Sequence, residues 1–151
     1  MPGHSLTSRI ASLALVFVLG GGACRSATEP QLDLVAARAL WTSLAPAAYE
    51  ITILRTCECL PEMSGPVTVV VRNGIVEWRH YVQSGATVAN AYADAFPTVS
   101  GLFSLLDEAA RNGTQPVSVQ FDPRLGYPVH IVIGDPATDS PVYDVSAFRA
   151  L

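Results

Sequence analysis

The chain of 151 residues contains no lysine, so all nine of its basic residues are arginine. Charged residues of both signs make up only 15% of the sequence, and the net charge is −4 at pH 7. Basic patches and basic runs interleaved with aromatic residues are absent, which excludes the electrostatic pattern of a nucleic-acid-binding protein. The sequence therefore predicts that nucleic acid is not among the partners.

Signatures of common catalytic sites are also missing. There is no G-x-S-x-G nucleophile elbow, no H-E-x-x-H zinc motif and no glycine-rich phosphate loop. Outside the first 23 residues the only histidines are His80 and His130, which do not combine with the cysteines into a compact zinc spacing. The sequence predicts no metal and no cofactor, and it favours a non-enzymatic protein over an enzyme.

Long apolar runs are absent as well. The run at residues 10–19 is about half of the ~20 residues that a membrane-spanning helix needs. Arg9 precedes it and small residues follow, so residues 1–23 have the layout of an export signal. The signal ends in Gly22-Ala23-Cys24, which resembles the lipobox of bacterial lipoproteins, although Gly21 stands where that pattern usually has leucine. The resemblance implies a lipid on Cys24. Ordinary signal cleavage, which would release a soluble secreted protein, is the alternative.

Three cysteines are an odd number for an oxidising compartment. If Cys24 carries the lipid, Cys57 and Cys59 remain as a pair and no thiol is left over. The cysteine count therefore favours lipidation, which would make the membrane a partner through Cys24. The residue after it is Arg25 and not aspartate. By resemblance to lipoprotein sorting, this favours the outer membrane, facing the periplasm, in a cell with two membranes.

The remaining chain reads as a lipid anchor and short polar tether at 24–31, followed by a single domain at 32–151. Removal of residues 1–23 leaves eight arginines against thirteen acids, a net charge of −5. Hydrophobic periodicity predicts elements in the order α-β-β-β-α-β-β-β. The expected helices lie at 32–44 and 98–111, and the expected strands at 49–59, 67–72, 75–82, 116–122, 129–133 and 142–148.

Consecutive hairpins predict an α+β fold: an antiparallel sheet of about five to six strands with two helices on one face and the other face wet. The best turn signal is Asn73-Gly74, which suits a two-residue type I′ turn. This turn sets the cross-strand register, in which Val69 faces Trp78 and Val67 faces His80. The face expected in the core carries Val67, Val69, Val71, Val76, Trp78 and His80.

Cys57 and Cys59 point to the same side of an extended strand, where their Cα atoms would lie ~6.6 Å apart. A disulfide accepts roughly 4.4–6.8 Å, so the pair can bridge with a slight bend. The three-residue loop limits the entropic stabilisation to about 1.6 kcal/mol. We interpret the pair as a structural disulfide. A redox-active C-x-C is the alternative, although the C-x-x-C helix context of thioredoxins is missing.

Three motifs of the chain occur in a recognisable order: Arg55-x-Cys57-x-Cys59, Val71-Arg72-Asn73-Gly74 and Asp122-Pro123-x-x-Gly126-Tyr127-Pro128. In these motifs the chain resembles a family of exported bacterial proteins, many of them lipoproteins, that is classed as a domain of unknown function. The likeness runs from about Trp41 to Val145. It implies the compartment and the cysteine pair, and it implies no activity.

Three functional hypotheses follow from the sequence. The first is a membrane-tethered, non-enzymatic binding or scaffold module of the cell envelope, which uses the exposed sheet face to bind an envelope protein. The second is a thiol–disulfide role at Cys57 and Cys59. The third is a small-molecule binder with a pocket between sheet and helices near Tyr81, Tyr92 and Tyr127.

Overall fold

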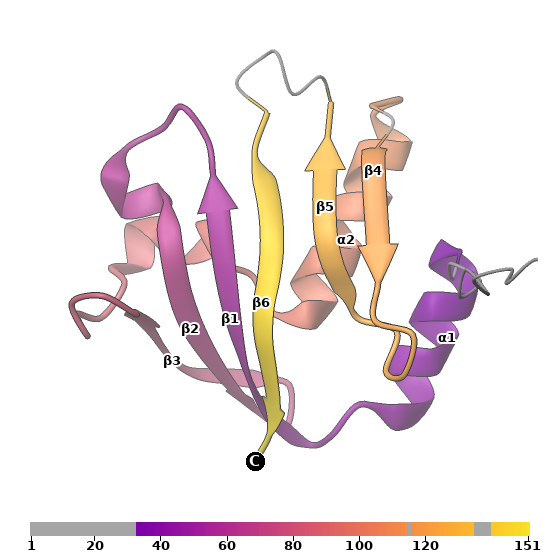
Figure 1. Ribbon diagram of the computed structural model, residues 1–151, viewed down its shortest axis with the longest axis horizontal. Helices are drawn as coiled ribbons and strands as arrows, with labels where there is room; N and C mark the ends of the chain where they lie inside the picture. Colours follow the sequence, from indigo (N-terminus) through magenta and orange to yellow (C-terminus); the bar gives the residue numbers. More distant parts are fainter. Residues whose placement is uncertain (1–32, 115, 135–139) are drawn as a thin grey trace, which may run out of the picture.

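A six-stranded antiparallel sheet forms the framework of the protein (Figure 1). The computed structural model describes residues 33–114, 116–134 and 140–151, so the predicted export signal at 1–23 and the predicted lipid anchor and tether at 24–31 lie outside the described residues. The elements are α1 (Leu34–Leu44), β1 (Ala48–Thr56), the short 3-10 helix η1 (Pro61–Met63), β2 (Gly65–Arg72), β3 (Ile75–Tyr81), the 3-10 helix η2 (Asn90–Ala95), α2 (Val99–Arg111), β4 (Pro116–Phe121), β5 (Pro128–Ile133) and β6 (Val142–Ala150).

The strand order across the sheet is β3-β2-β1-β6-β5-β4. Hairpins join β1, β2 and β3 into one meander and β4, β5 and β6 into another, while β1 and β6 pair at the centre. Strands β3 and β4 therefore form the two opposite edges. The predicted element order and the antiparallel α+β architecture are confirmed.

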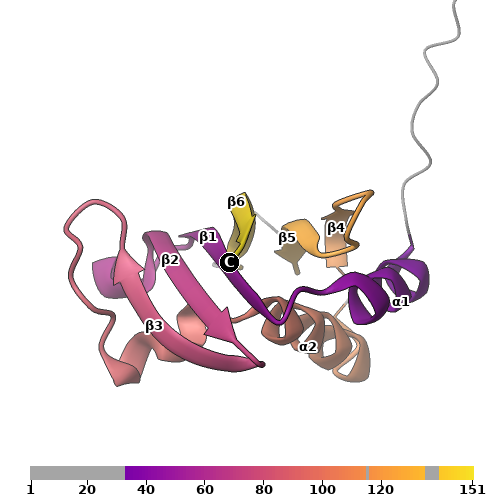
Figure 2. The same cartoon turned by 90° about the horizontal axis from the view of Figure 1, so that it is seen from below.

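The two α-helices lie on one side of the sheet, and Figure 2 shows the other side without a covering element. Each helix begins at a side-chain cap: Asp33 accepts a hydrogen bond from the Ala36 amide, and Thr98 accepts one from the Gly101 amide. Such caps each stabilise a helix by about 1 kcal/mol. No helix among residues 33–114, 116–134 and 140–151 is both long and apolar enough to span a bilayer.

The hydrophobic core fills the layer between the sheet and the helices. Alternate residues of β1 and β2 point into it, and α2 contributes one apolar stripe. Side chains of this size stabilise the fold by roughly 1.5–3 kcal/mol each when they are fully buried. The largest of them are Ile51, Ile53, Val67, Val69, Phe96, Leu102, Leu106 and Ile131.

The predicted hairpin turn is present between β2 and β3. Asn73 has φ 51° and Gly74 has φ 78°, so both central residues adopt the positive φ that a type I′ turn requires. The predicted register is correct for the first two pairs, Arg72 with Ile75 and Val71 with Val76, and wrong from there on, because the pairing shifts at a β-bulge between Val70 and Val71. Beyond the bulge, Trp78 faces Val70 instead of Val69, and Val67 faces Tyr81 instead of His80.

The bulge reverses the faces of the rest of β3. Trp78 and His80, expected in the core, lie on the outer face, where their rings stack with centroids 4.5 Å apart. Arg79 and Tyr81 point inward instead. The position of Arg79 is set by tertiary hydrogen bonds: its Nε donates to the Phe96 carbonyl at 2.8 Å, and its own carbonyl accepts from the Val88 amide at 2.9 Å.

Candidate functional site

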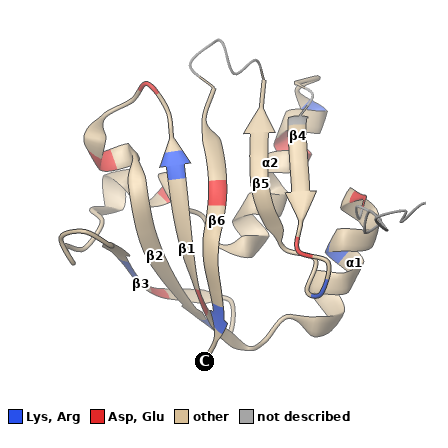
Figure 3. Ribbon diagram, in the orientation of Figure 1, with Lys and Arg blue, Asp and Glu red and all other residues tan. Residues whose placement is uncertain are grey.

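Arg55 is a buried charged residue at the end of β1. Strand alternation places it on the inner face after Ile51 and Ile53, and only 9% of the residue is exposed. Its Nε donates to the Tyr143 hydroxyl at 3.3 Å, and its guanidinium carbon lies 5.8 Å from the centroid of that ring. Charged residues are scattered along the chain in Figure 3, and none of the ion pairs within the described part includes Arg55.

The cysteine pair lies against this guanidinium. Cys57 and Cys59 follow β1 directly, with their sulfur atoms in disulfide contact and their Cα atoms 5.3 Å apart. Nη1 of Arg55 lies 2.8 Å from Cys57 Sγ, 3.2 Å from Cys59 Sγ and 2.7 Å from the Met63 carbonyl oxygen. Both cysteines are partly exposed. The contact agrees with the expected disulfide, which stays a prediction for the protein in solution.

From the sequence, Arg55 was named only as part of the motif Arg55-x-Cys57-x-Cys59 and was assigned no role. The alternation of β1 could have indicated that Arg55 is buried, because it occupies the next inward position after Ile51 and Ile53. A buried charge is destabilising unless polar groups surround it. Arg55 therefore requires the acceptors that the β1–β2 connection supplies.

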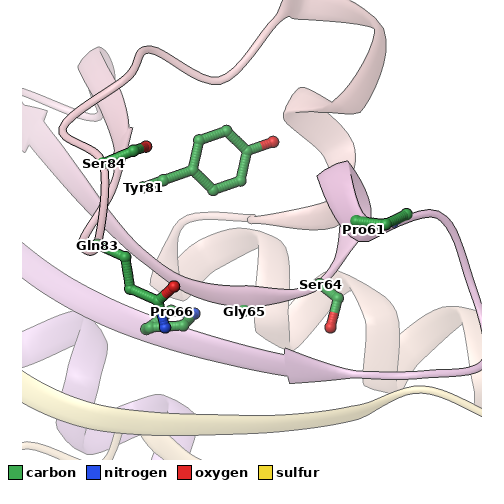
Figure 4. Close-up of a pocket in the computed structure, with 7 residues that line it drawn as sticks. All are labelled: Pro61, Ser64, Gly65, Pro66, Tyr81, Gln83 and Ser84. Carbon is green, nitrogen blue, oxygen red and sulfur yellow. The ribbon is translucent and has the colours of Figure 1, made fainter.

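A pocket of about 330 Å³ lies beside the same connection (Figure 4). The ring of Tyr81 lies between Ser84 on one side and Pro61 on the other. The Tyr81 hydroxyl donates to the Glu62 carbonyl and so joins β3 to η1. All lining residues are uncharged: Pro61, Ser64, Gly65, Pro66, Tyr81, Gln83 and Ser84.

The three tyrosines proposed for ligand binding lie in two different places. Tyr81 lines the pocket, and its pKa is raised by burial and by the nearby Glu62 and Tyr92. Tyr127 instead packs on an aromatic cluster, with its ring centroid 4.8 Å from Phe148, and burial raises its pKa. Of the three, only Tyr81 lines the pocket, while Tyr92 lies outside its lining and Tyr127 belongs to the separate aromatic cluster.

The uncovered outer face of the sheet has polar side chains that pair with one another. The pairs are Thr52 with Thr68 at 3.4 Å, Arg149 with Glu50 at 3.0 Å and His130 with Asp144 at 2.6 Å. Their hydrogen-bonding groups are therefore used within the sheet. Across the described segments, no three His, Cys, Asp or Glu side chains gather as metal ligands would.

A protein-family model matches residues 33–150, a span that includes both the pocket and the cysteine pair. The chain belongs to the family of unknown function DUF6174. The predicted membership in a domain family of unknown function is confirmed, whereas export and lipidation of this DUF6174 chain stay predictions. Searches of curated proteins and of solved structures find no match to the chain.

Proposed function

We propose that this DUF6174 chain is a lipid-anchored, non-enzymatic binding protein of the bacterial cell envelope, with its ligand site in the pocket beside Tyr81. The anchor is supported by Gly22-Ala23-Cys24 at the end of a signal-like segment. It is also supported by the sulfur contact between Cys57 and Cys59, which leaves Cys24 as the cysteine available to a lipid. A cysteine with several acyl chains anchors a protein stably, whereas a single chain holds it only marginally.

The position of the pocket suits a tethered domain. Helix α1, which follows the tether in sequence, packs at the β4–β5 end of the sheet, where Gly126 touches the Ala37 carbonyl. The pocket is lined by residues of η1, of β2 and β3 and of the segment that follows β3. Figure 1 shows β3 at the edge of the sheet opposite to α1. An anchor that enters at α1 therefore leaves the pocket at the far edge of the domain, accessible to a ligand.

The lining of the pocket defines the chemical class of its ligand. A volume of about 330 Å³ lies at the small end of the range for small-molecule sites, roughly 300–1,000 Å³. Tyr81 and two prolines offer apolar surface, while Ser64, Gln83 and Ser84 offer hydroxyl and amide groups. An uncharged lining does not compensate a charged ligand for its lost hydration. The ligand is therefore an uncharged compound with hydroxyl or amide groups beside an apolar face, as in an N-acetylated saccharide. The uncharged lining is the observation that carries this proposal.

The test measures the melting temperature of the protein with N,N′-diacetylchitobiose as a neutral probe and chitobiose as its amine-bearing counterpart. The neutral probe should raise the melting temperature, because a ligand at 100 times its dissociation constant stabilises the folded state by about 2.7 kcal/mol. Gln83→Trp should fill the pocket and abolish the shift. The matched control is Gln120→Trp, on an exposed position of edge strand β4, and it should keep the shift. Equal shifts in the two variants, or a shift with the charged probe only, would contradict the proposal.

A further inference from the structure

The acceptors around Arg55 depend on the redox state of the cysteine pair. In the disulfide, the two sulfur atoms 2.8 and 3.2 Å from Nη1 are neutral, weak acceptors. After reduction, a thiolate at either position would be a charged acceptor, and charge-assisted hydrogen bonds are about twice as strong as neutral ones. The buried guanidinium is therefore better compensated when one of the two sulfurs is a thiolate.

We infer that Arg55, Cys57 and Cys59 form a thiol–disulfide exchange site that accepts electrons from thiol compounds. An incoming thiolate attacks Cys59 Sγ and forms a new S–S bond to it. The Cys57–Cys59 bond breaks, and its electron pair goes to Cys57 Sγ beside Arg55. A second thiolate then attacks the sulfur of the bound thiol, which releases a disulfide of the two thiols and leaves Cys59 to take up a proton. Two thiols are oxidised and the protein disulfide is reduced.

Cys57 is the leaving sulfur because it lies closer to the cation, at 2.8 Å against 3.2 Å for Cys59. A leaving thiolate that is better stabilised departs faster. Three other groups bear on the charge of the pair. The Met63 carbonyl oxygen lies 3.9 Å from Cys57 Sγ and disfavours a thiolate there, but Nη1 of Arg55 binds the same oxygen at 2.7 Å. Glu58, between the two cysteines in sequence, also opposes a thiolate, and the Tyr143 hydroxyl accepts from the Arg55 Nε. Glu58 is exposed and screened by solvent, whereas Arg55 is buried, so the effect of the cation is dominant.

Two further features favour exchange over a purely structural bond. Both cysteines are partly exposed at the end of a strand, within reach of a small thiol. Their loop of three residues also adds little chain-entropy stabilisation to the oxidised state. The site is distinct from the uncharged pocket, so either proposal can fail without the other.

The test equilibrates the full-length protein, purified in detergent, with glutathione buffers of graded ratio and traps free thiols with an alkylating reagent. The wild type should reach partial reduction within these buffers. Arg55→Met should lower the equilibrium constant for reduction about 10- to 100-fold, the value of a hydrogen bond to a charged group. Arg55→Lys, which keeps the charge, should fall between the two. Arg72→Met is the matched control, because Arg72 is exposed and paired with Glu77, and it should behave as the wild type.

An equal equilibrium constant in wild type and folded Arg55→Met would overturn the inference. So would a wild-type disulfide that stays oxidised throughout the buffers. If Arg55→Met does not fold, the thiolate absorbance of the reduced wild type decides: a thiolate at pH 7 supports the site, and two protonated thiols contradict it. Peptide mapping after acid quenching should find glutathione on Cys59, and glutathione on Cys57 would overturn the assignment of the leaving sulfur.

Discussion

The two ends of the central β1–β6 pair face the same inner layer but differ in chemistry. The first end, here the aromatic end, consists of Trp41, Tyr49, Tyr127 and Phe148. Their ring centroids lie 4.8–6.2 Å apart in edge-to-face and stacked pairs. The second, here the sulfur end, consists of Arg55, Cys57, Cys59, Met63 and Tyr143.

Because of this difference, one end of the strand pair contributes mainly to stability and the other end can react. Aromatic pairs contribute about 0.5–1.5 kcal/mol each beyond their burial, and they have no group that changes state near neutral pH. The sulfur end holds a buried cation whose acceptors include two sulfurs that can change redox state. We therefore expect substitutions at the aromatic end to change stability alone, and substitutions at the sulfur end to change thiol chemistry.

The largest expected effect is at the aromatic end. Trp41→Ala should lower the free energy of unfolding by about 3–5 kcal/mol, because Trp41 is 7% exposed and touches three other rings. Urea denaturation measures this change, and Trp78→Ala on the outer face is the control with the smaller loss. The glutathione equilibrium of folded Trp41→Ala should match the wild type. A changed equilibrium would show that the aromatic end also influences the thiol chemistry of the cysteine pair.

Removal of the cysteine pair should have a smaller effect on stability. Cys57→Ala combined with Cys59→Ala should cost about 1–2 kcal/mol and leave a folded domain, since the closed loop is short. Urea denaturation and circular dichroism measure the two parts of this expectation. If the double variant lost as much free energy of unfolding as Trp41→Ala, the sulfur end would be as important for stability as the aromatic end.

The smallest effect is a decline in stability at alkaline pH. Burial raises the pKa of Tyr49 and of Tyr127 above the ordinary value of about 10. Above pH ~10 the unfolded chain loses these protons before the folded chain does, so their stabilising contribution is complete below that pH and is lost as the pH rises through the folded pKa. Each tyrosine should lower the free energy of unfolding by at most about 1.4 kcal/mol per pH unit in this range. Urea denaturation between pH 8 and 11 should show a shallower decline for Tyr127→Phe than for the wild type, and equal slopes would argue against this source.

The fold could be predicted from sequence where local signals determine it. Asn73-Gly74 indicates its turn because few other residues tolerate two positive φ values. The register could not be predicted, because strict alternation favours the apolar Trp78 as the inward residue. The bulge turns Arg79 inward instead, where the Phe96 carbonyl accepts its hydrogen bond from another part of the chain. The pairing of β1 with β6 is equally non-local.

The candidate site was predictable to the same degree. Spacing and cysteine count identified Cys57 and Cys59, whereas the role of Arg55 depends on a loop that returns the Met63 carbonyl to its guanidinium. The pocket is lined by residues of the β1–β2 connection and of the segment after β3, which are brought together only by the fold. From the sequence, therefore, only one of its lining residues, Tyr81, was proposed for ligand binding. Tyr127 is held by aromatic packing, which aromatic composition alone does not distinguish from ligand binding.

Non-reducing peptide mapping by mass spectrometry of the full-length protein, purified from its producing cell, examines the cysteine pair and the lipid anchor in one measurement. We expect one peptide with Cys57 and Cys59 joined, and a mature N-terminus at Cys24 that carries the mass of a lipid. The first result is required for the exchange site, and the second for the anchored binding protein. A disulfide that includes Cys24, a mature Cys24 without a lipid, or a Cys57 and Cys59 pair that stays free in oxidised glutathione would contradict these expectations.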